Sequence, residues 1–143
     1  MSEENKVIAR GFFEAWTEGN LDALDELLAP DSVDHDPYNP HGQDGLEGGK
    51  KTIAMYREAF PDTSFEIEDQ LAEGDKVVTR WTATGTHEGE LMGMQPTGKK
   101  ATITGITIDR IEDGKIAEGW TNWDTLAMMQ SIGAIPEQEA ARA

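Results

Sequence analysis

The side chains best suited to chemistry in this chain are the carboxylate of Asp124 and the imidazole of His35. Asp124 follows Trp120 and Trp123, and a carboxylate beside indole rings can act as a general acid or base in apolar surroundings. It also precedes a helix-forming segment, where a carboxylate caps free backbone N–H groups for about 1 kcal/mol. We therefore predict that Asp124 either moves a proton or caps a helix. His35 is predicted to be either a catalytic base or a hydrogen-bonded wall residue.

The spacing of the histidines does not indicate a metal site. His35, His41 and His87 form no HExxH or comparable ligand pattern. In the run Asp34-His35-Asp36, successive strand residues point to opposite faces, so His35 would face away from both carboxylates. The chain has no cysteine, which excludes a thiolate nucleophile and a cysteine-ligated metal. We predict no metal and no cofactor.

The charge balance limits the possible partners. The chain has 28 acidic and 12 basic residues, a formal net charge of −16, so nucleic acid and anionic membranes would repel it. Residues 93–99 match the start of a phosphate-binding loop, but Lys100 stands where Ser or Thr should hold magnesium. No apolar run is long enough to cross a bilayer. We expect a soluble, cytoplasmic protein.

Helical periodicity is concentrated in the first half of the chain, where Ile8, Phe12 and Trp16 recur on one face. Residues 37–49 hold two prolines and four glycines and are predicted to form a loop. The expected helices are residues 3–18, a short helix capped by Asn20 and ended by Pro30, residues 50–60, and a last helix that starts at Asp124.

Period-2 alternation and turn residues predict the strands. A hairpin within residues 101–123 is expected to turn at Glu112-Asp113-Gly114-Lys115, since Asp-Gly pairs adopt positive φ angles. Arg80 and Arg110 lie in mid-strand. They either neutralise an acid such as Asp109 or Glu118, or form cross-strand ion pairs on the outer face. The other expected strands are residues 32–36, the segment from Phe65 to Leu71, and residues 76–87.

Helices gathered early and strands gathered late indicate an α+β fold. We expect a strongly curved, mostly antiparallel sheet, packed with the N-terminal helices into a cone with an internal pocket. One domain should cover residues 1–143, with a frayed tail over 136–143. The side chains predicted to bind substrate are Trp16, Tyr38, Tyr56, Trp81, Thr107, Trp120, Thr121 and Trp123.

Four segments together carry a family resemblance. They are Phe-Glu-Ala-Trp-Thr-Glu-Gly-Asn at 13–20, Leu-Leu-Ala-Pro-Asp at 27–31, Gly-Glu-Leu-Met-Gly-Met-Gln-Pro-Thr-Gly-Lys at 89–99, and Arg-Ile-Glu-Asp-Gly-Lys-Ile at 110–116. With them the chain resembles, over nearly its whole length, the SnoaL-like polyketide cyclases of the nuclear-transport-factor-2-like superfamily. The resemblance implies a curved sheet, a deep apolar pocket and a homo-oligomer. In the true cyclases a carboxylate acid/base closes a polyketide ester ring by an intramolecular aldol reaction, without metal or cofactor.

The sequence departs from the family pattern at two positions. The resemblance places the acid/base aspartate of the cyclases at Thr121 and its partner histidine at Thr107, whereas Asp124 is retained. Neither threonine exchanges a proton near pH 7.

The leading hypothesis is a cofactor-independent enzyme that performs acid/base chemistry beside a carbonyl: a cyclisation, an isomerisation or a related lyase step. Asp124 or His35 would move the proton. The donors to a developing enolate would be Thr107, Thr121, Tyr38 and Tyr56. The ligand is expected to be a small apolar or aromatic compound with a carbonyl group.

Two other functions remain open. The chain is either a non-catalytic pocket protein that binds an apolar metabolite, or an epoxide hydrolase-like enzyme that uses Arg80 with Asp109 or Asp124. In each case we expect a homodimer or a higher homo-oligomer, because a sheet face with Trp81 or Trp120 and Ile106 cannot bury every apolar side chain in one small pocket.

Overall fold

The computed structural model describes residues 2–91 and 93–136 and has the α+β architecture that the sequence predicts. The helices are α1 (Ser2–Glu18), the 3-10 helix η1 (Leu21–Ala23), α2 (Leu24–Leu27), α3 (Gly45–Ala59) and α4 (Thr125–Ser131). The strands are β1 (Leu28–His35), β2 (Ser64–Glu73), β3 (Lys76–Thr86), β4 (Lys100–Glu112) and β5 (Lys115–Trp123). None of the described helices combines the length and the apolar character needed to cross a bilayer.

Two predictions extend beyond the described residues. Of the frayed tail predicted over 136–143, residues 137–143 lie outside the described residues. The assignment of residues 1–143 to one domain stays a prediction.

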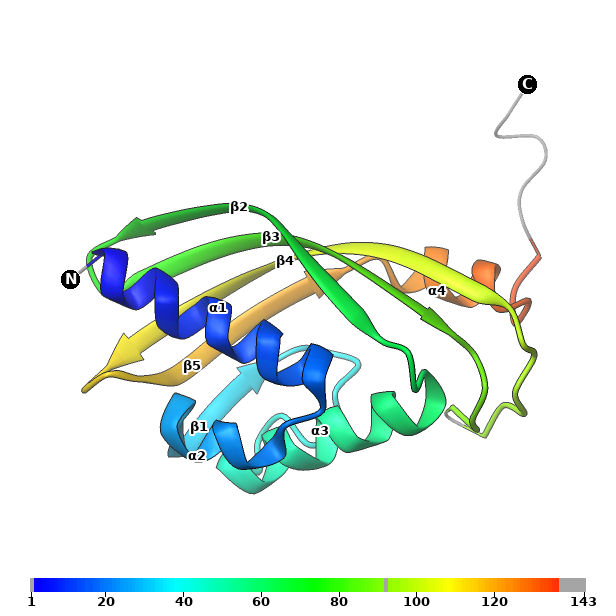
Figure 1. The fold of residues 1–143 in the computed structure, drawn as a ribbon, viewed down its shortest axis with the longest axis horizontal. Helices are drawn as coiled ribbons and strands as arrows, with labels where there is room; N and C mark the ends of the chain where they lie inside the picture. The colour runs from blue at the N-terminus through cyan, green and yellow to red at the C-terminus, as the bar shows by residue number, and fades with distance from the viewer. Residues whose placement is uncertain (1, 92, 137–143) are drawn as a thin grey trace.

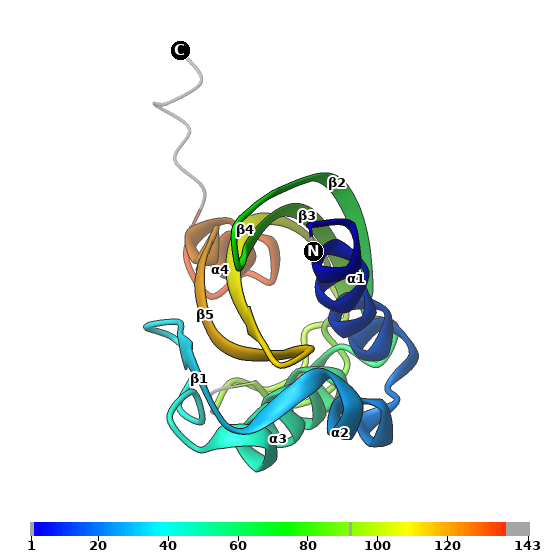
Figure 2. The same ribbon diagram turned by 90° about the vertical axis from the view of Figure 1, so that its left-hand side faces the viewer.

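The described strands form one mixed sheet in the order β1-β5-β4-β3-β2. β1 and β5 are parallel, and the other neighbouring pairs are antiparallel. Figure 2 shows the sheet curling without closing, with α1 along its β2–β3 side and with α2 and α3 beside β1. In Figure 1, α4 lies at the far end of the sheet, where it packs on β4. The curved, mostly antiparallel sheet is therefore confirmed.

The hairpin between β4 and β5 forms where the sequence predicts it. Asp113 has a φ of 52° and Gly114 a φ of 76°, which are the left-handed conformations that this short connection requires. The prediction for Asn20 is also confirmed, since its side-chain oxygen accepts a hydrogen bond of 3.2 Å from the N–H of Ala23.

The third helix starts earlier than predicted. α3 begins at Gly45, although the glycines of residues 37–49 predict a loop. These glycines serve close packing: a Cβ on Gly49 would lie 2.6 Å from Cδ1 of Leu28, and one on Gly48 would lie 2.3 Å from the carbonyl oxygen of His41. Tertiary packing thus outweighs the low helix propensity of glycine.

The first strand also starts earlier than the predicted 32–36, because Leu28 already pairs with Ile116 of β5. Pro30 was expected to end a helix and instead lies within β1. A proline is tolerated there because β1 is an edge strand, and its missing N–H removes no bond from the interior of the sheet.

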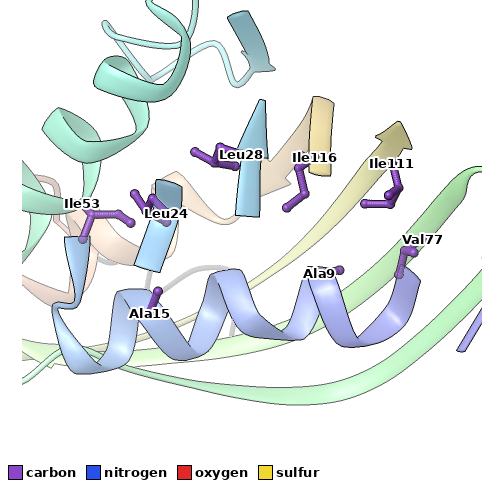
Figure 3. Packing of buried hydrophobic residues seen from close by; sticks show 8 residues of the cluster. All are labelled: Ala9, Ala15, Leu24, Leu28, Ile53, Val77, Ile111 and Ile116. Carbon is purple, nitrogen blue, oxygen red and sulfur yellow. The ribbon is translucent and has the colours of Figure 1, made fainter. Parts of the chain in front are cut away.

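The aliphatic core lies between α1 and the hairpin end of the sheet (Figure 3). Ala9 and Ala15 face this core from α1, and their small side chains let the helix approach the strands closely. The other members are Leu24, Leu28, Ile53, Val77, Ile111 and Ile116. A separate aromatic cluster forms around Phe13 and Trp81.

Gly105 of β4 makes room for the indole of Trp81. It pairs with Trp81 on one side and with Trp123 on the other. A Cβ on Gly105 would lie 2.3 Å from Cζ2 of Trp81. The indole is held by Phe13 and Phe65, at ring-centroid distances of 6.2 and 5.1 Å, so it has little freedom to move away.

We predict that Gly105→Ala destabilises the protein by about 1–3 kcal/mol, the usual cost of overpacking a filled core. The midpoint of urea unfolding should fall while its slope stays unchanged. Thr104→Ala, at an exposed position next to it on β4, is the control and should shift the free energy of unfolding by less than about 0.5 kcal/mol. Equal midpoints for Gly105→Ala and the parent would contradict the close contact.

Candidate functional site

A cavity of about 150 Å³ lies between the curved sheet and the helices α1 and α3. One water needs roughly 15 Å³ of such space and about 30 Å³ of liquid volume. The cavity therefore has room for about ten waters, or for a ligand of about ten to fifteen non-hydrogen atoms. Most of its wall is aromatic and aliphatic, but three carboxylates also line it: Asp34, Asp36 and Asp109.

Asp34 and Asp109 lie in one row across three strands. Gly119 of β5 pairs with Asp34 of β1 on one side and with Asp109 of β4 on the other. Because Gly119 has no side chain, the two carboxylates approach each other over its Cα. A Cβ placed there would be 3.0 Å from Oδ1 of Asp109 and 3.9 Å from Oδ1 of Asp34. We call Asp34 and Asp109 the carboxylate pair.

Asp109 is the most perturbed acid of the site. Its side chain is buried, and its Oδ2 atom has no hydrogen-bond partner among the described residues. Burial, followed by the negative charge of Asp34, raises the pKa of Asp109 to about 7. Because the charge of Asp34 disfavours ionisation of Asp109, the Asp109 proton is retained below about pH 7.

Asp34 is held in place by a small network. Burial raises its pKa, and a hydrogen bond of 3.0 Å from the amide of Asn39 acts in the opposite direction. The amide oxygen of Asn39 accepts bonds of 2.9 Å from the hydroxyl of Thr52 and from the backbone N–H of His41. These bonds orient the amide so that its NH₂ group points at Asp34.

A row of hydroxyl groups lies beside the carboxylate pair. Thr107 of β4 pairs with Thr121 of β5, and their hydroxyl oxygens are 3.2 Å apart. The indole N–H of Trp81 donates a bond of 3.0 Å to Oγ1 of Thr107. Thr107 and Thr121 therefore form a hydroxyl pair that lines the cavity.

Asp36 lies near a tyrosine and an indole. It accepts hydrogen bonds of 3.0 Å from the backbone N–H of Tyr38 and from Nε1 of Trp123. Burial, and then the charge of Asp36, raise the pKa of Tyr56 to about 12. Tyr56 thus keeps its proton at neutral pH and is a hydrogen-bond donor rather than a base. In the part of the chain that the structure describes, no three acidic or histidine side chains are arranged to hold a metal ion.

Six of the predicted site residues line this cavity: Trp16, Tyr56, Trp81, Thr107, Thr121 and Trp123. The structure brings them together from α1, α3, β3, β4 and β5.

His35 and Trp120 lie on the opposite face of the sheet. His35 is exposed, and its Nε2 atom is 2.7 Å from Oε2 of Glu118. Its ring stacks on that of Trp120 at a centroid distance of 5.4 Å. The strand alternation that turns Asp34 and Asp36 inward turns His35 outward, as the sequence predicts. Neither His35 nor Trp120 lines the cavity.

Asp124 and Tyr38 also lie outside the cavity. Asp124 is exposed and caps α4, its Oδ1 accepting a bond of 2.9 Å from the N–H of Ala127. The structure therefore places Asp124 as the helix cap, one of its two predicted roles. Tyr38 is 53% exposed, and its ring packs against that of Trp123 in a T-shaped arrangement at a centroid distance of 6.2 Å.

The sequence does not predict the carboxylate pair. It offers Asp109 only as an acid that Arg80 or Arg110 could neutralise, and Asp34 only as a neighbour of His35 that points to the opposite face. Arg110 instead bonds to Glu118 at 3.3 Å and Arg80 to Asp69 at 2.8 Å, the predicted cross-strand pairs. The signal that identifies Asp109 is its period-2 spacing from Thr107, which was already a site candidate.

Comparisons with known proteins identify relatives over most of the chain. The family model of the SnoaL-like polyketide cyclases matches residues 6–132. The comparison with curated proteins gives no match.

Several solved structures are similar. TsrD from Streptomyces laurentii has 29% identity and a TM-score of 0.84, over 93% of this chain and 97% of that one. IdmH from Streptomyces antibioticus, for which polyketide cyclase activity is proposed, has 35% identity and a TM-score of 0.77, over 90% and 98%. AclR from Streptomyces galilaeus, for which hydroxylase activity is proposed, has 28% identity and a TM-score of 0.85, over 99% and 88%.

Asp109→Asn is expected to change the stability of the protein in a pH-dependent way. The folded protein holds the Asp109 proton up to a pKa of about 7, against an ordinary value of 3.8. Between these values folding binds a proton, so the parent loses stability as the pH rises and the loss is complete above about pH 7. About three pKa units at ~1.4 kcal/mol each set an upper bound of about 4 kcal/mol. Asparagine cannot ionise, so the free energy of unfolding of the variant does not fall with pH for this reason.

Urea unfolding between about pH 4 and pH 8 measures the effect. The stability of Asp109→Asn relative to the parent should increase up to about pH 7 and then stay constant. Asp75→Asn, the same substitution at an exposed position, should show no such trend. A difference between Asp109→Asn and the parent that is independent of pH would contradict the raised pKa.

Proposed function

The chain belongs to the SnoaL-like polyketide cyclase family, and we propose that it is an enzyme that moves a proton beside a carbonyl group. The reaction is a cyclisation, an isomerisation or a related lyase step on a small apolar or aromatic compound. In this proposal the carboxylate pair carries the proton, in place of Asp124 or His35. The supporting observation is the position of Asp34 and Asp109 on either side of Gly119, within a largely apolar cavity.

One proton shared by two carboxyl groups supplies both a base and an acid. The ionised member removes a proton from the carbon next to the carbonyl: the C–H bond breaks, an O–H bond forms, and the electron pair moves to the carbonyl oxygen as an enolate. In a cyclisation the enolate carbon bonds to a second carbonyl carbon. The oxygen of that carbonyl takes a proton from the carboxylic acid, which restores the pair. A pKa of about 7 for Asp109 suits both steps at neutral pH.

The hydroxyl pair stabilises the enolate in this mechanism. Thr107 accepts the indole N–H of Trp81, so its own hydroxyl hydrogen is available for Thr121. Thr121 in turn donates to the enolate oxygen. Donors already oriented in a water-poor cavity stabilise developing charge more than they would in water.

Binding without catalysis is the second candidate. It is favoured by the aromatic cavity wall and by the threonines that stand where the family resemblance places the acid/base groups. Epoxide hydrolysis, in contrast, needs an arginine between two aspartates. Arg80 and Arg110 bond to Asp69 and Glu118 on the outer face, and neither arginine lines the cavity.

Anthrone is a suitable probe, because its carbonyl oxygen and its acidic CH₂ group lie on opposite edges of a flat ring system. We predict that the protein accelerates exchange of the CH₂ protons with deuterium, followed by proton NMR in D₂O under nitrogen. The double variant Asp34→Asn/Asp109→Asn, which leaves the pair no carboxylate to act as the base, should lower the protein-dependent rate by about 100-fold or more. Anthrone should still bind to this variant, because asparagine keeps the shape of the side chain.

Asp75→Asn makes the same kind of substitution outside the cavity and should exchange anthrone protons at the parental rate. A parental rate for the double variant would rule out the carboxylate pair as the base. If the parent binds anthrone without accelerating exchange, the non-catalytic function is the better description.

We further propose a homodimer formed through the outer face of the sheet. Ile106, Ile108 and Trp120 alternate with cavity residues and so point away from the cavity, and Ile106 is 48% exposed. Apolar side chains gathered on one face are typical of an association surface. The cytoplasmic location stays a prediction.

Light scattering coupled to size-exclusion chromatography should give the mass of a dimer. Ile106→Lys should give a monomer, because it places an unpaired charge in the contact. Val7→Lys, on α1 at a 62% exposed position, makes the same change elsewhere and should leave the dimer intact. A parent that elutes as a monomer over a wide concentration range would refute the dimer.

A further inference from the structure

Among the described residues, Asn39 is the only one whose side chain donates a hydrogen bond to the carboxylate pair. Its Nδ2 atom lies 3.0 Å from Oδ2 of Asp34. The carboxyl group of Asp109 receives no such bond from these residues, and its Oδ2 atom is buried without a partner. A negative charge is therefore stabilised by a donor on Asp34 but not on Asp109.

The orientation of the Asn39 amide is fixed by its other contacts. Its Oδ1 atom is 2.9 Å from the backbone nitrogen of His41 and 2.9 Å from Oγ1 of Thr52. A backbone N–H can only donate, so it must face the amide oxygen and not the NH₂ group. The NH₂ group therefore points to Asp34. Because it too can only donate, the carboxyl group of Asp34 must be the acceptor.

The loop that carries Asn39 is tied to the elements on either side of it. Thr52 of α3 is buried, and its hydroxyl hydrogen is shared between Oδ1 of Asn39 and the carbonyl oxygen of Gly48, at 2.9 and 2.8 Å. The backbone N–H of Asp34 donates to the carbonyl oxygen of Gly42 at 2.8 Å, and Gly42 donates to that of Asn39 at 3.3 Å. The amide donor is thus held next to Asp34 before a substrate binds.

The charge of Asp34 depends on several neighbours. A hydrogen bond donated to a carboxyl oxygen favours the ionised form. Burial raises the pKa of Asp34; the bond from Asn39 lowers it, the charge of Asp36 raises it and the charge of His35 lowers it, in decreasing order of effect. Asp109 faces Asp34 from β4. Asn39 is therefore the main influence that keeps Asp34 ionised.

The rest of the cavity wall offers no stronger source of positive charge. In the part of the chain that the structure describes, no lysine or arginine lines the cavity. The other titratable side chains of the wall are His41, whose Nδ1 atom is 3.6 Å from Oδ2 of Asp44, and Tyr56 of α3. A neutral amide thus stands where an ion pair would have a cation.

We propose that Asn39 is a positioning residue that makes the two members of the carboxylate pair unequal. Asp34 is the ionised member and takes the proton from the substrate, whereas Asp109 holds a proton and gives it up. The inference rests on the proposed function for its chemistry, but the inequality itself belongs to the protein without a substrate. Loss of the amide would leave fewer molecules with a base at Asp34.

The same hydrogen bond resets the site after a reaction. Once Asp34 has taken a proton from carbon and Asp109 has given one to oxygen, the proton lies on the wrong member of the pair. Its return from Asp34 to Asp109 breaks one O–H bond and forms another, with no net change in protons. The amide of Asn39 favours this direction, because it binds a carboxylate more strongly than a carboxylic acid.

The inequality can be measured in the whole protein without a substrate, by carbon-13 NMR of aspartate labelled at the side-chain carboxyl carbon. Spectra between about pH 3 and pH 9 cover the range in which the pair should titrate. The signals of Asp34 and Asp109 are assigned by their absence in Asp34→Asn and Asp109→Asn. In the parent, the Asp34 signal should have its titration midpoint at a lower pH than the Asp109 signal.

Two variants remove the donor in different ways. Asn39→Asp keeps an oxygen for His41 and Thr52 to donate to, whereas Asn39→Leu has a similar shape and adds no charge. Each should raise the midpoint of the Asp34 signal by about one pH unit or more, because a hydrogen bond to the charged form is lost. Gln43→Glu converts an exposed amide of the same loop to a carboxylate and should leave that midpoint as in the parent.

Three results would overturn the proposal. The first is an Asp34 midpoint above that of Asp109 in the parent, and the second is a parental Asp34 midpoint in Asn39→Asp. The third is a rise in Asn39→Asp without one in Asn39→Leu, since repulsion by the added carboxylate would then be the whole effect.

A signal of the parent keeps the test decisive even if Asn39→Leu does not fold. The side-chain amide protons of Asn39, assigned by their absence in Asn39→Asp, should shift with the same midpoint as the Asp34 carbon. Amide protons that follow Asp109, or that do not titrate, would also overturn the proposal. Because no substrate is present, these results are independent of whether the protein exchanges the protons of anthrone.

Discussion

The interior of this protein depends on the register of β5 between β1 and β4. Gly119 lies opposite both Asp34 and Asp109. A shift of one residue would put Glu118 or Trp120 in that place and turn every cavity side chain of β5 outward. The left-handed turn at Asp113 and Gly114 begins the hairpin, and an irregularity between Arg110 and Ile111 then shifts β5 by one residue, which brings Gly119 opposite Asp109. At the other end, Trp123 lies beside the side-chain-free Gly105.

That register brings Asp34 and Asp109 together in a region where Asp109 has few hydrogen-bond partners. Asp34 receives the amide of Asn39, while Oδ2 of Asp109 has no partner in the described part of the chain. Burial of Asp109 works against folding above neutral pH, and the aliphatic core beneath α1 supplies the opposing free energy. The site thus lowers the stability of a scaffold that is stabilised elsewhere.

Local sequence signals were enough for the fold, and long-range pairing decided the site. The Asp113-Gly114 turn, the cap at Asn20 and the periodicity of α1 are each encoded within a few residues. Trp120 and Trp123 looked equivalent in the sequence, although an odd spacing on a strand puts them on opposite faces. Asp34 and His35 also alternate, but which of them faces inward depends on the pairing of β1 with β5. The partners in that pairing, such as His35 and Trp120, are far apart in the chain.

Arg57 has a consequence for how this cavity could be redesigned. Its guanidinium donates to the carbonyl oxygens of Trp16 at 3.0 Å and Thr17 at 2.9 Å, at the end of α1. It also donates to those of Thr63 at 3.4 Å and Pro61 at 3.0 Å. One side chain thereby joins the end of α1 to the segment between α3 and β2. This junction fixes the positions of the two helices. The close contact between Gly105 and Trp81 leaves no room for a larger residue at position 105. A library meant to admit larger ligands should therefore vary side chains at fixed backbone positions, such as Phe12 and Ile103, and keep Arg57 constant. Lysine is not a substitute there, because a single ammonium cannot reproduce the planar fork of donors.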